Sequence, residues 1–186
     1  VYARLIWSGL SLGTEKQKTA LVTGAAGFIG HHISNTLLSV GWSVVGLDCK
    51  SDYYDVSLKE RRAGMLLQNA SYKSVHEKAE TSNVLMDLFK EERPNIVIHL
   101  AAQAGVRYSI KNPKVYLDSN IVGSFNIFEA AKKFKVKHLI LGSSSSVYGA
   151  NKKIPFSEFD KADNQVSFYA ATKKSMENLA HSYSSL

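Results

Sequence analysis

The chain has 186 residues, a length that allows one domain with a sizeable hydrophobic core. Its net charge of +7 is spread over small groups of Lys and Arg, with no basic stripe interleaved with aromatic residues, so we expect no nucleic-acid partner. The single cysteine, Cys49, excludes an internal disulfide and favours a reducing compartment, which we expect to be the cytoplasm.

The sequence also lacks the patterns of metal and membrane proteins. Its six histidines show no ligand spacing, so we expect no metal site. No apolar run approaches the roughly 20 residues that a membrane helix needs, so we expect no membrane insertion. Residues 1–18 mix Arg4 with a short apolar stretch and show no clear cleavage site. We expect them to be a disordered leader, followed by one domain over residues 19–186.

The first predicted elements form a βαβ unit. Residues 19–23 are a short apolar run that predicts a buried strand, and residues 42–48 predict a second one. Between them, residues 28–40 carry apolar side chains at helical spacing, and Gly41 ends the helix. The apolar face of this helix is formed by Ile29, Ile33, Leu37 and Val40.

The rest of the chain continues the alternation of strands and helices. Further strands are predicted at residues 72–76, 95–101 and 138–143. Helices are predicted in the second part of residues 52–69 and at residues 83–92, 115–134 and 168–184. Residues 95–101 are interpreted as apolar throughout, as a strand covered on both faces requires. This order predicts an α/β fold with a Rossmann-like, doubly wound parallel sheet.

A glycine pattern follows the first strand. Gly24, Gly27 and Gly30 stand in Gly-x-x-Gly-x-x-Gly between a strand and a helix, where backbone N–H groups can approach a pyrophosphate closely. Asp48 ends the second strand, where a carboxylate accepts both ribose hydroxyls of a dinucleotide and repels a 2′-phosphate. The pattern therefore predicts a site for NAD rather than NADP, although Lys50 weakens that preference. A tight turn and a turn aspartate are the alternative interpretations.

A Tyr-x-x-x-Lys pair opens the last predicted helix. Tyr169 and Lys173 lie one helical turn apart, and a lysine charge near a phenol favours phenolate, so Tyr169 could act as a general base. The spacing alone is a weak signal. The position of the pair strengthens the prediction. The preceding strand ends in residues 143–146, which are all serines, and ligands bind at the carboxyl ends of parallel strands. A plain polar turn is the alternative for these serines.

Five segments together carry a resemblance to a known family. They are TGAAGFIG (23–30), HLAAQAGVRYS (99–109), SNIVGSFNIFEA (119–130), SSSSVYG (143–149) and YAATKK (169–174). In this order they resemble the extended short-chain dehydrogenase/reductase family, also called NAD-dependent epimerase/dehydratases. Residues 52–59, 101–109 and 143–149 most resemble UDP-glucuronate 4-epimerases. The resemblance implies oxidation of the sugar C4 hydroxyl by tightly held NAD, rotation of the 4-keto sugar, and return of hydride to its other face.

The resemblance also implies roles for individual residues. Tyr169 would be the base, Lys173 its partner and a ribose ligand, and Ser144 the partner of the substrate hydroxyl. The implied cofactor-binding residues are Gly24, Gly27, Phe28, Ile29, Gly30, Asp48, Leu100, Ala101, Ala102, Gln103, Ser119, Tyr169 and Lys173. The implied substrate-binding residues are Arg107, Ser144, Ser145 and Ser146. For Arg107 a structural surface role is equally open.

The chain departs from the family pattern in two respects. Lys78 stands where an aspartate usually contacts adenine, and family members are about twice as long, so the resemblance implies that the C-terminal substrate domain lies outside this sequence. Ser145 and Ser146 supply no carboxylate, which favours epimerisation over dehydration or decarboxylation.

Several alternatives remain open. The substrate could be another UDP-sugar, as in a UDP-glucose 4-epimerase or another nucleotide-sugar epimerase or dehydratase. A non-catalytic NAD-binding scaffold or sensor is an alternative of another class. The resemblance also implies a homodimer that pairs through the helices predicted at residues 115–134 and 168–184.

Overall fold

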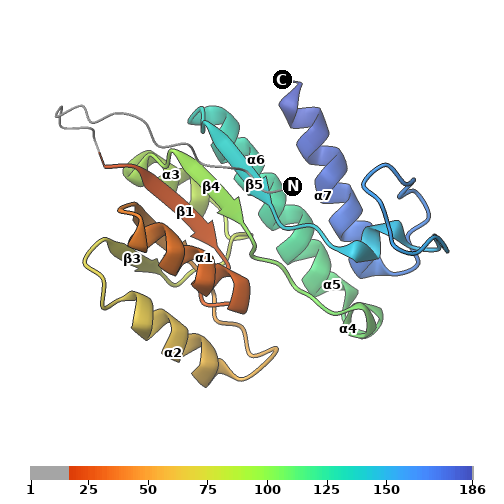
Figure 1. The fold of residues 1–186 in the computed structure, drawn as a ribbon, viewed down its shortest axis with the longest axis horizontal. Helices are drawn as coiled ribbons and strands as arrows, with labels where there is room; N and C mark the ends of the chain where they lie inside the picture. Colours follow the sequence, from red (N-terminus) through yellow and green to blue (C-terminus); the bar gives the residue numbers. More distant parts are fainter. Residues whose placement is uncertain (1–16, 186) are drawn as a thin grey trace.

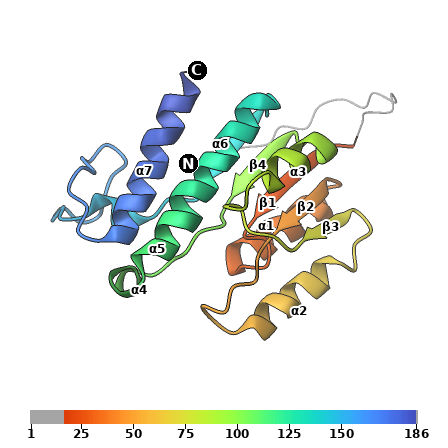
Figure 2. The same cartoon turned by 180° about the vertical axis from the view of Figure 1, so that it is seen from behind.

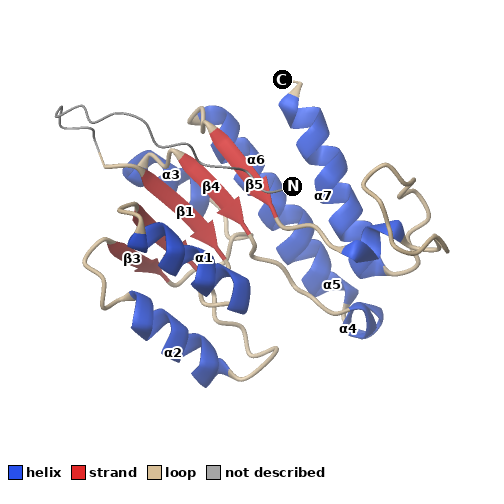
Figure 3. Cartoon of the chain, viewed as in Figure 1, coloured by secondary structure: helices blue, strands red, loops and turns tan. Residues whose placement is uncertain are grey.

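The computed structural model describes residues 17–185, so almost all of the predicted leader lies outside the described residues. Its five strands are β1 (Thr19–Thr23), β2 (Ser43–Leu47), β3 (Tyr72–Val75), β4 (Ile96–His99) and β5 (His138–Leu141). They form one sheet in the order β3-β2-β1-β4-β5, and every neighbouring pair is parallel (Figure 3). The predicted Rossmann-like fold is therefore confirmed. The chain reverses its direction across the sheet between β1 and β4, the place where such sheets open a ligand crevice.

Helices cover both faces of the sheet. They are α1 (Phe28–Ser39), α2 (Val56–Leu66), α3 (Val84–Glu92), α4 (Val106–Lys111), α5 (Pro113–Tyr116), α6 (Gly123–Lys133) and α7 (Phe168–Ser184). Figures 1 and 2 show α1 and α2 on one face, α3 and α6 on the other, and α7 alongside α6. None of the helices within residues 17–185 is both long and apolar enough to cross a membrane.

The core is divided between the two faces by the alternation of side chains along the central strands. Leu21 of β1 is level with Val45 and Val97, and these side chains pack with α3 and α6. Val22 and its neighbour Ile98 point to the opposite face and pack with α1 and α2. The central strands are apolar on both faces for this reason.

Helix α1 buries only the middle of its predicted apolar face: Ile33 and Leu37 pack against the core, but the two ends of the stripe do not. Ile29 and Val40 are 59% and 66% exposed, whereas Gly30 and Ser34 are buried. A Cβ on Gly30 would overlap the carbonyl oxygen of Gly24, so only a residue without a side chain lets the helix approach the turn after β1. Close packing of the glycine turn, rather than apolar area, sets the orientation of α1.

The helix predicted at residues 115–134 is present, but its winding changes along its length. Residues Leu117–Val122 form a π-helical segment, here called η1, which joins α5 to α6 without a break in the chain's helical course. The sequence also gave no indication of α4 or of the 3₁₀ turn Ser145–Tyr148, called η2. Such short helices carry too few residues for a periodic pattern.

A buried hydrogen-bond network joins the ends of β1 and β4. The Thr23 hydroxyl accepts the backbone N–H groups of Leu100 and Ala101 at 3.2 and 3.1 Å and lies 2.7 Å from Nδ1 of His99. Since this oxygen accepts twice, its own proton goes to Nδ1, and Nε2–H of His99 donates to Ser124 at 3.0 Å. His99 is thus a neutral, fully bonded residue, and the interpretation of its strand as apolar throughout was wrong at this position.

Replacing Gly30 by alanine is expected to lower the free energy of unfolding by about 1–3 kcal/mol, because the new methyl group competes with the Gly24 carbonyl for space. Gly64→Ala is the matched control. Gly64 lies inside α2 with nothing within 4 Å of an added Cβ, and its replacement should stabilise by about 0.5–1 kcal/mol. Chemical denaturation of both variants measures the contrast, and equal stability of Gly30→Ala and the parent would contradict it.

The buried histidine predicts a loss of stability in acid. Burial, followed by the nearby charge of Lys173, lowers the pKa of His99 to about 3. Between pH 6.5 and pH 3 the unfolded chain therefore binds a proton at this residue that the folded chain excludes, so stability falls as the pH falls.

We expect His99 to lower the free energy of unfolding by about 2 kcal/mol between pH 7.5 and pH 5. The decrease is about 1.4 kcal/mol for each pH unit below 6.5. Denaturation curves of the parent and of His99→Gln at several pH values test this expectation. The variant should show a shallower dependence, with the remaining slope owed in part to His31, whose pKa is also lowered by burial. The same slope in both proteins would refute the assignment.

Candidate active site

A cavity of about 410 Å³ lies at the carboxyl edge of the sheet. Its walls follow the ends of β1, β2, β3 and β4, which is where the topology places a ligand crevice. Eight residues predicted to bind the cofactor line it: Gly24, Gly27, Asp48, Leu100, Ala101, Ala102, Gln103 and Ser119. The sequence analysis thus identified two opposite walls of one cavity from segments that are far apart in the chain.

Asp48 is held in place by the glycine turn. Its carboxylate accepts the backbone N–H of Ala26 at 2.9 Å through Oδ2 and that of Lys50 at 2.7 Å through Oδ1. Each carboxylate oxygen has a second lone pair, and the side chain is half-buried against the cavity. The geometry allows the predicted acceptor role toward a ribose, with the carboxylate fixed by the same loop that would hold the phosphates.

The predicted catalytic pair, Tyr169 and Lys173, lies outside the wall of this cavity. Tyr169 is half-buried, and its ring meets that of Tyr116 edge-on at 6.0 Å between centroids. The Tyr116 hydroxyl donates to the carbonyl oxygens of Ala104, at 2.7 Å, and Gly105. Ala104 belongs to the cavity wall, so Tyr116 connects Tyr169 to that wall.

Lys173 is buried without a carboxylate partner among the described residues. Its ammonium donates to the carbonyl oxygen of Gly142 at 2.8 Å, directly after β5, and only 5% of the residue is exposed. Burial lowers the pKa of Lys173 to about 8. The proton on this ammonium is therefore held more loosely than on a surface lysine.

Asn120 joins the helix of the catalytic pair to the cavity wall. Its side chain accepts the N–H of Gln103 at 2.7 Å and donates to the Gln103 carbonyl at 3.1 Å and to the Thr172 hydroxyl at 3.0 Å. Asn120 lies in η1, and Thr172 stands directly before Lys173 on α7. Sequence reasoning missed Asn120, because its partners are 17 and 52 positions away.

The serine run forms the turn η2 after β5. The hydroxyl of Ser144 accepts the N–H of Ser146 at 3.2 Å and thereby caps η2, which leaves its own proton free to donate. Ser143 instead donates to Glu177 of α7 at 2.6 Å, and Ser145 is exposed. The Ser144 hydroxyl is therefore oriented and keeps a proton to donate, while its role toward a substrate stays a prediction.

Besides the Tyr–Lys pair and the serines, four predicted contacts lie outside the cavity wall, and one of them, Gly30, is buried against the glycine turn. The side chains of Phe28 and Ile29 are 65% and 59% exposed at the start of α1, and Arg107 is exposed on α4. Their roles remain predictions. Lys78 does line the cavity, with Glu77 and Glu80 beside it, where the family pattern has an aspartate.

The cavity fits the dinucleotide that the sequence predicts. Gly24 has a φ of +73°, and a Cβ on it would lie 2.9 Å from the N atom of Ala101, so a side chain would fill the space between the turn and the opposite wall. The open turn faces the start of α1, whose first N–H groups are free to bind phosphate. The carboxylate of Asp48 lies in the same wall, where the sequence predicts that it accepts the ribose hydroxyls.

Comparisons with known proteins agree with this geometry. Residues 20–186 match the family described as NAD dependent epimerase/dehydratase. A probable UDP-glucuronate 4-epimerase of Rhizobium meliloti (strain 1021) is 53% identical over 166 residues, covering 89% of this chain and 49% of that protein. The chain therefore spans about half the length of the curated relatives it matches.

Solved structures give the same picture. UDP-glucuronic acid 4-epimerase from Bacillus cereus, in complex with UDP-glucuronic acid and NAD, superposes with a TM-score of 0.82 at 36% identity, over 89% of this chain and 52% of that one. UDP-glucose 4-epimerase from Thermotoga maritima with UDP-glucose gives 0.77 at 30% identity, over 89% and 50%. With the glycine turn, Asp48 and the Tyr169–Lys173 helix in place, this chain belongs to the NAD-dependent epimerase/dehydratase family.

Proposed function

We propose that the full-length protein is an NAD-dependent nucleotide-sugar 4-epimerase that interconverts UDP-glucuronate and UDP-galacturonate. The observation that carries the proposal is the Asn120 link, which fixes the helix of Tyr169 and Lys173 against the wall of the dinucleotide cavity. An NAD-binding scaffold would have no need for a Tyr–Lys pair that is linked to the wall of the cofactor cavity. When bound, NAD would accept a hydride from C4 of the sugar, and its reduced form would return that hydride to the 4-keto sugar.

The residues of the chain would handle the proton. The phenolate oxygen of Tyr169 would accept the proton of the sugar C4 hydroxyl and return it once the sugar has turned over. The hydroxyl of Ser144 would donate to the same sugar oxygen, since its acceptor side is occupied by Ser146. The charge of Lys173 would stabilise the phenolate. One base and one hydroxyl suffice for epimerisation, and the η2 turn contains no carboxylate of the kind that elimination of water requires.

The choice of substrate rests on the relatives. Five of the curated relatives, at 44–53% identity, and three matching structures carry the name UDP-glucuronate or UDP-glucuronic acid 4-epimerase. The match to a UDP-glucose 4-epimerase structure is weaker in both identity and TM-score. Arg107 is our candidate for the sugar carboxylate. We propose that residues 19–186 form the cofactor-binding part of the enzyme. We also propose that the enzyme works in the cytoplasm, a reducing compartment in which the thiol of Cys49 stays free.

The test is conversion of UDP-glucuronate by the full-length protein, followed by chromatography of the UDP-sugars. We expect UDP-galacturonate to appear, and we expect Tyr169→Phe to lower the rate at least 100-fold, as loss of a general base does. Tyr183→Phe is the control, because Tyr183 is also on α7 and bonds only Glu129. Turnover of UDP-glucose instead would favour the alternative epimerase, and NAD binding without turnover of either sugar would favour a scaffold.

We further propose that two copies pair through η1 and α7. A groove of about 530 Å³ between these elements is lined largely by apolar side chains, including Leu117, Ile121 and Leu179. In a two-fold interface, each copy would cover the groove of the other copy with the same elements.

Light scattering should therefore give twice the chain mass for the full-length protein, and Leu179→Glu should shift it toward the monomer. Ile154→Glu is the matched control, since Ile154 is 88% exposed and lies outside the groove. A monomer in the parent protein, or a dimer unaffected by Leu179→Glu, would contradict this interface.

A further inference from the structure

The serine run after β5 carries the hydroxyl that the proposed reaction uses, yet few hydrogen bonds tie it to the rest of the fold. Inside the turn, Ser144 accepts the N–H of Ser146 through its hydroxyl and that of Val147, at 3.1 Å, through its carbonyl. Within residues 17–185, a single hydrogen bond joins residues 143–146 to another helix or strand. In that bond the hydroxyl of Ser143 donates to Oε1 of Glu177 on α7 at 2.6 Å.

Glu177 continues the side of α7 that carries the predicted catalytic pair. Tyr169, Lys173 and Glu177 follow one another at intervals of four residues, so they lie on successive turns of the helix. Lys173 donates to the carbonyl oxygen of Gly142, and Glu177 accepts from Ser143, the next residue. Helix α7 therefore bonds two consecutive residues at the start of the serine run.

The carboxylate of Glu177 is itself oriented by a second bond. Its Oε2 accepts the ammonium of Lys174 at 3.0 Å, which leaves Oε1 directed at Ser143. The side chain of Glu177 is 33% exposed, and Ser143 is exposed. Because a hydrogen bond in such a position replaces one to water, it adds little to the stability of the fold. Its main effect should be on the orientation of the turn.

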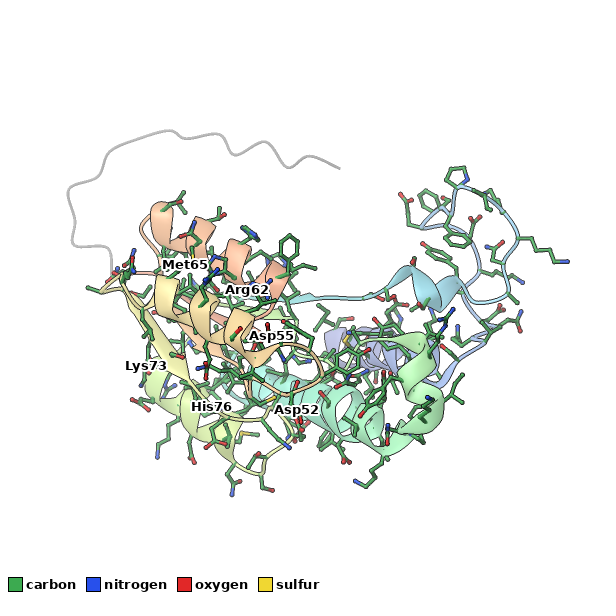
Figure 4. The ribbon with its side chains drawn as sticks, turned by 90° about the horizontal axis from the view of Figure 1, so that it is seen from below. Asp52, Asp55, Arg62, Met65, Lys73 and His76 are labelled. Atoms are coloured by element: carbon green, nitrogen blue, oxygen red, sulfur yellow. The ribbon has the colours of Figure 1, made fainter. Side chains whose placement is uncertain are left out.

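The bond between Ser143 and Glu177 is separate from the dinucleotide cavity. Figure 4 shows α7 and the turn after β5, both in blue shades, on the side of the molecule away from α2, where Asp55 and Met65 are labelled. Among the described residues that line the cavity there is none from 142–146 or from α7. A change in this bond should therefore alter the turn without altering the cavity wall.

We propose that Glu177 is a positioning residue, which accepts the hydroxyl of Ser143 and thereby fixes the turn in the orientation that presents the Ser144 hydroxyl to the substrate oxygen. Ser143 and Ser144 are consecutive, so a rotation of the backbone at Ser143 moves the Ser144 hydroxyl. A displacement of a reacting group by about 1 Å can cost up to about 100-fold in rate. The inference rests on the proposed reaction and deepens it, because it adds a residue that acts through Ser144.

The first test is a double-mutant cycle in the full-length protein with UDP-glucuronate as substrate. We expect Glu177→Ala and Ser143→Ala each to lower kcat about 5- to 20-fold, as loss of a hydrogen bond to a charged group does. The double variant should lose no more than either single one, since both remove the same bond. The affinity for NAD, measured by titration calorimetry without any sugar, should stay unchanged. Losses of kcat that add up, or a loss of NAD affinity that matches them, would overturn the proposal.

Two further variants separate positioning from charge and from a general effect on α7. Glu177→Gln keeps an oxygen that accepts from Ser143 but removes the charge, so it should recover most of the kcat that Glu177→Ala loses. Glu129→Ala removes a bond of the same kind, between a carboxylate of α6 and the hydroxyl of Tyr183 on α7, and should keep the kcat of the parent protein. A glutamine variant as slow as the alanine variant would show that the charge acts, and would overturn the proposal.

The second test follows the turn itself, without substrate. The N–H groups of Ser146 and Val147 are bonded to Ser144, so a looser turn exposes them to exchange with solvent. Mass spectrometry of peptides that cover residues 143–149 should show about fivefold faster amide hydrogen exchange in Glu177→Ala, and parent rates in Glu177→Gln and Glu129→Ala. Unchanged exchange in Glu177→Ala beside a lowered kcat would refute an effect through the turn.

Failure of this proposal is separable from failure of the proposed reaction. Absence of turnover of any UDP-sugar by the parent protein would overturn both. Normal turnover of UDP-glucuronate, with kcat unchanged in Glu177→Ala, would remove only the role of Glu177. Turnover of UDP-glucose instead would remove only the choice of substrate, and the same cycle measured with that sugar would decide on Glu177.

Discussion

The hydroxyl group of Thr23 holds the two walls of the cavity together. It accepts two N–H groups from the chain after β4 and gives its proton to His99, while Gly24, the next residue, turns the chain toward α1. Because β1 and β4 are neighbours at the point where the strand order reverses, this oxygen joins the two strand ends beside the crevice, together with the backbone bond from Leu100 to the Thr23 carbonyl. A buried polar group of this network that lost its partner would lower the stability of the fold, so each member depends on the others.

The catalytic helix is coupled to the same walls through a second polar link. Asn120 bonds Gln103 of the cavity wall and Thr172 of α7, and it does so from the π-helical segment η1. A π-helical turn widens the helix locally and shifts the side chains that follow it, and such turns occur often at functional sites. Here the shift falls where Asn120 must face both partners. The charge of Lys173 also reaches the Thr23 network, since it contributes to the lowered pKa of His99.

The fold could be predicted from local patterns because the strands are short, apolar and flanked by strong signals. The βαβ unit follows from two apolar runs and the helical spacing between them, and Asp48 from its place at the end of the second run. The exposure of Ile29 and Val40 at the ends of the predicted face of α1 could not be predicted, because the contact of Gly30 with the turn turns the helix so that only Ile33 and Leu37 of that face pack against the core. That choice depends on tertiary packing, which periodicity does not contain.

The candidate site was predicted where its residues belong to a local motif and missed where they act over a distance. The serine run and the Tyr169–Lys173 spacing are visible in short windows of sequence. Asn120 is an ordinary polar residue in a helical pattern, and its role arises only when residues 17 and 52 positions away come together. Lys59 was visible as part of a motif, yet its burial was not, since a lysine on a helix is expected to face solvent.

The two buried lysines are positions at which the fold gives up stability. Lys59 and Lys173 are each 5% exposed and bond only neutral oxygens within residues 17–185, while exposed Lys73 has two glutamate partners. A chain under no functional constraint would place its acids beside the costly cations and leave the exposed ones to water. The reverse arrangement leaves two buried ammonium groups without a carboxylate partner in the described chain, one in the cavity wall at Lys59 and one on α7 at Lys173. An anionic group that binds beside either lysine should therefore recover stability that the empty fold gives up.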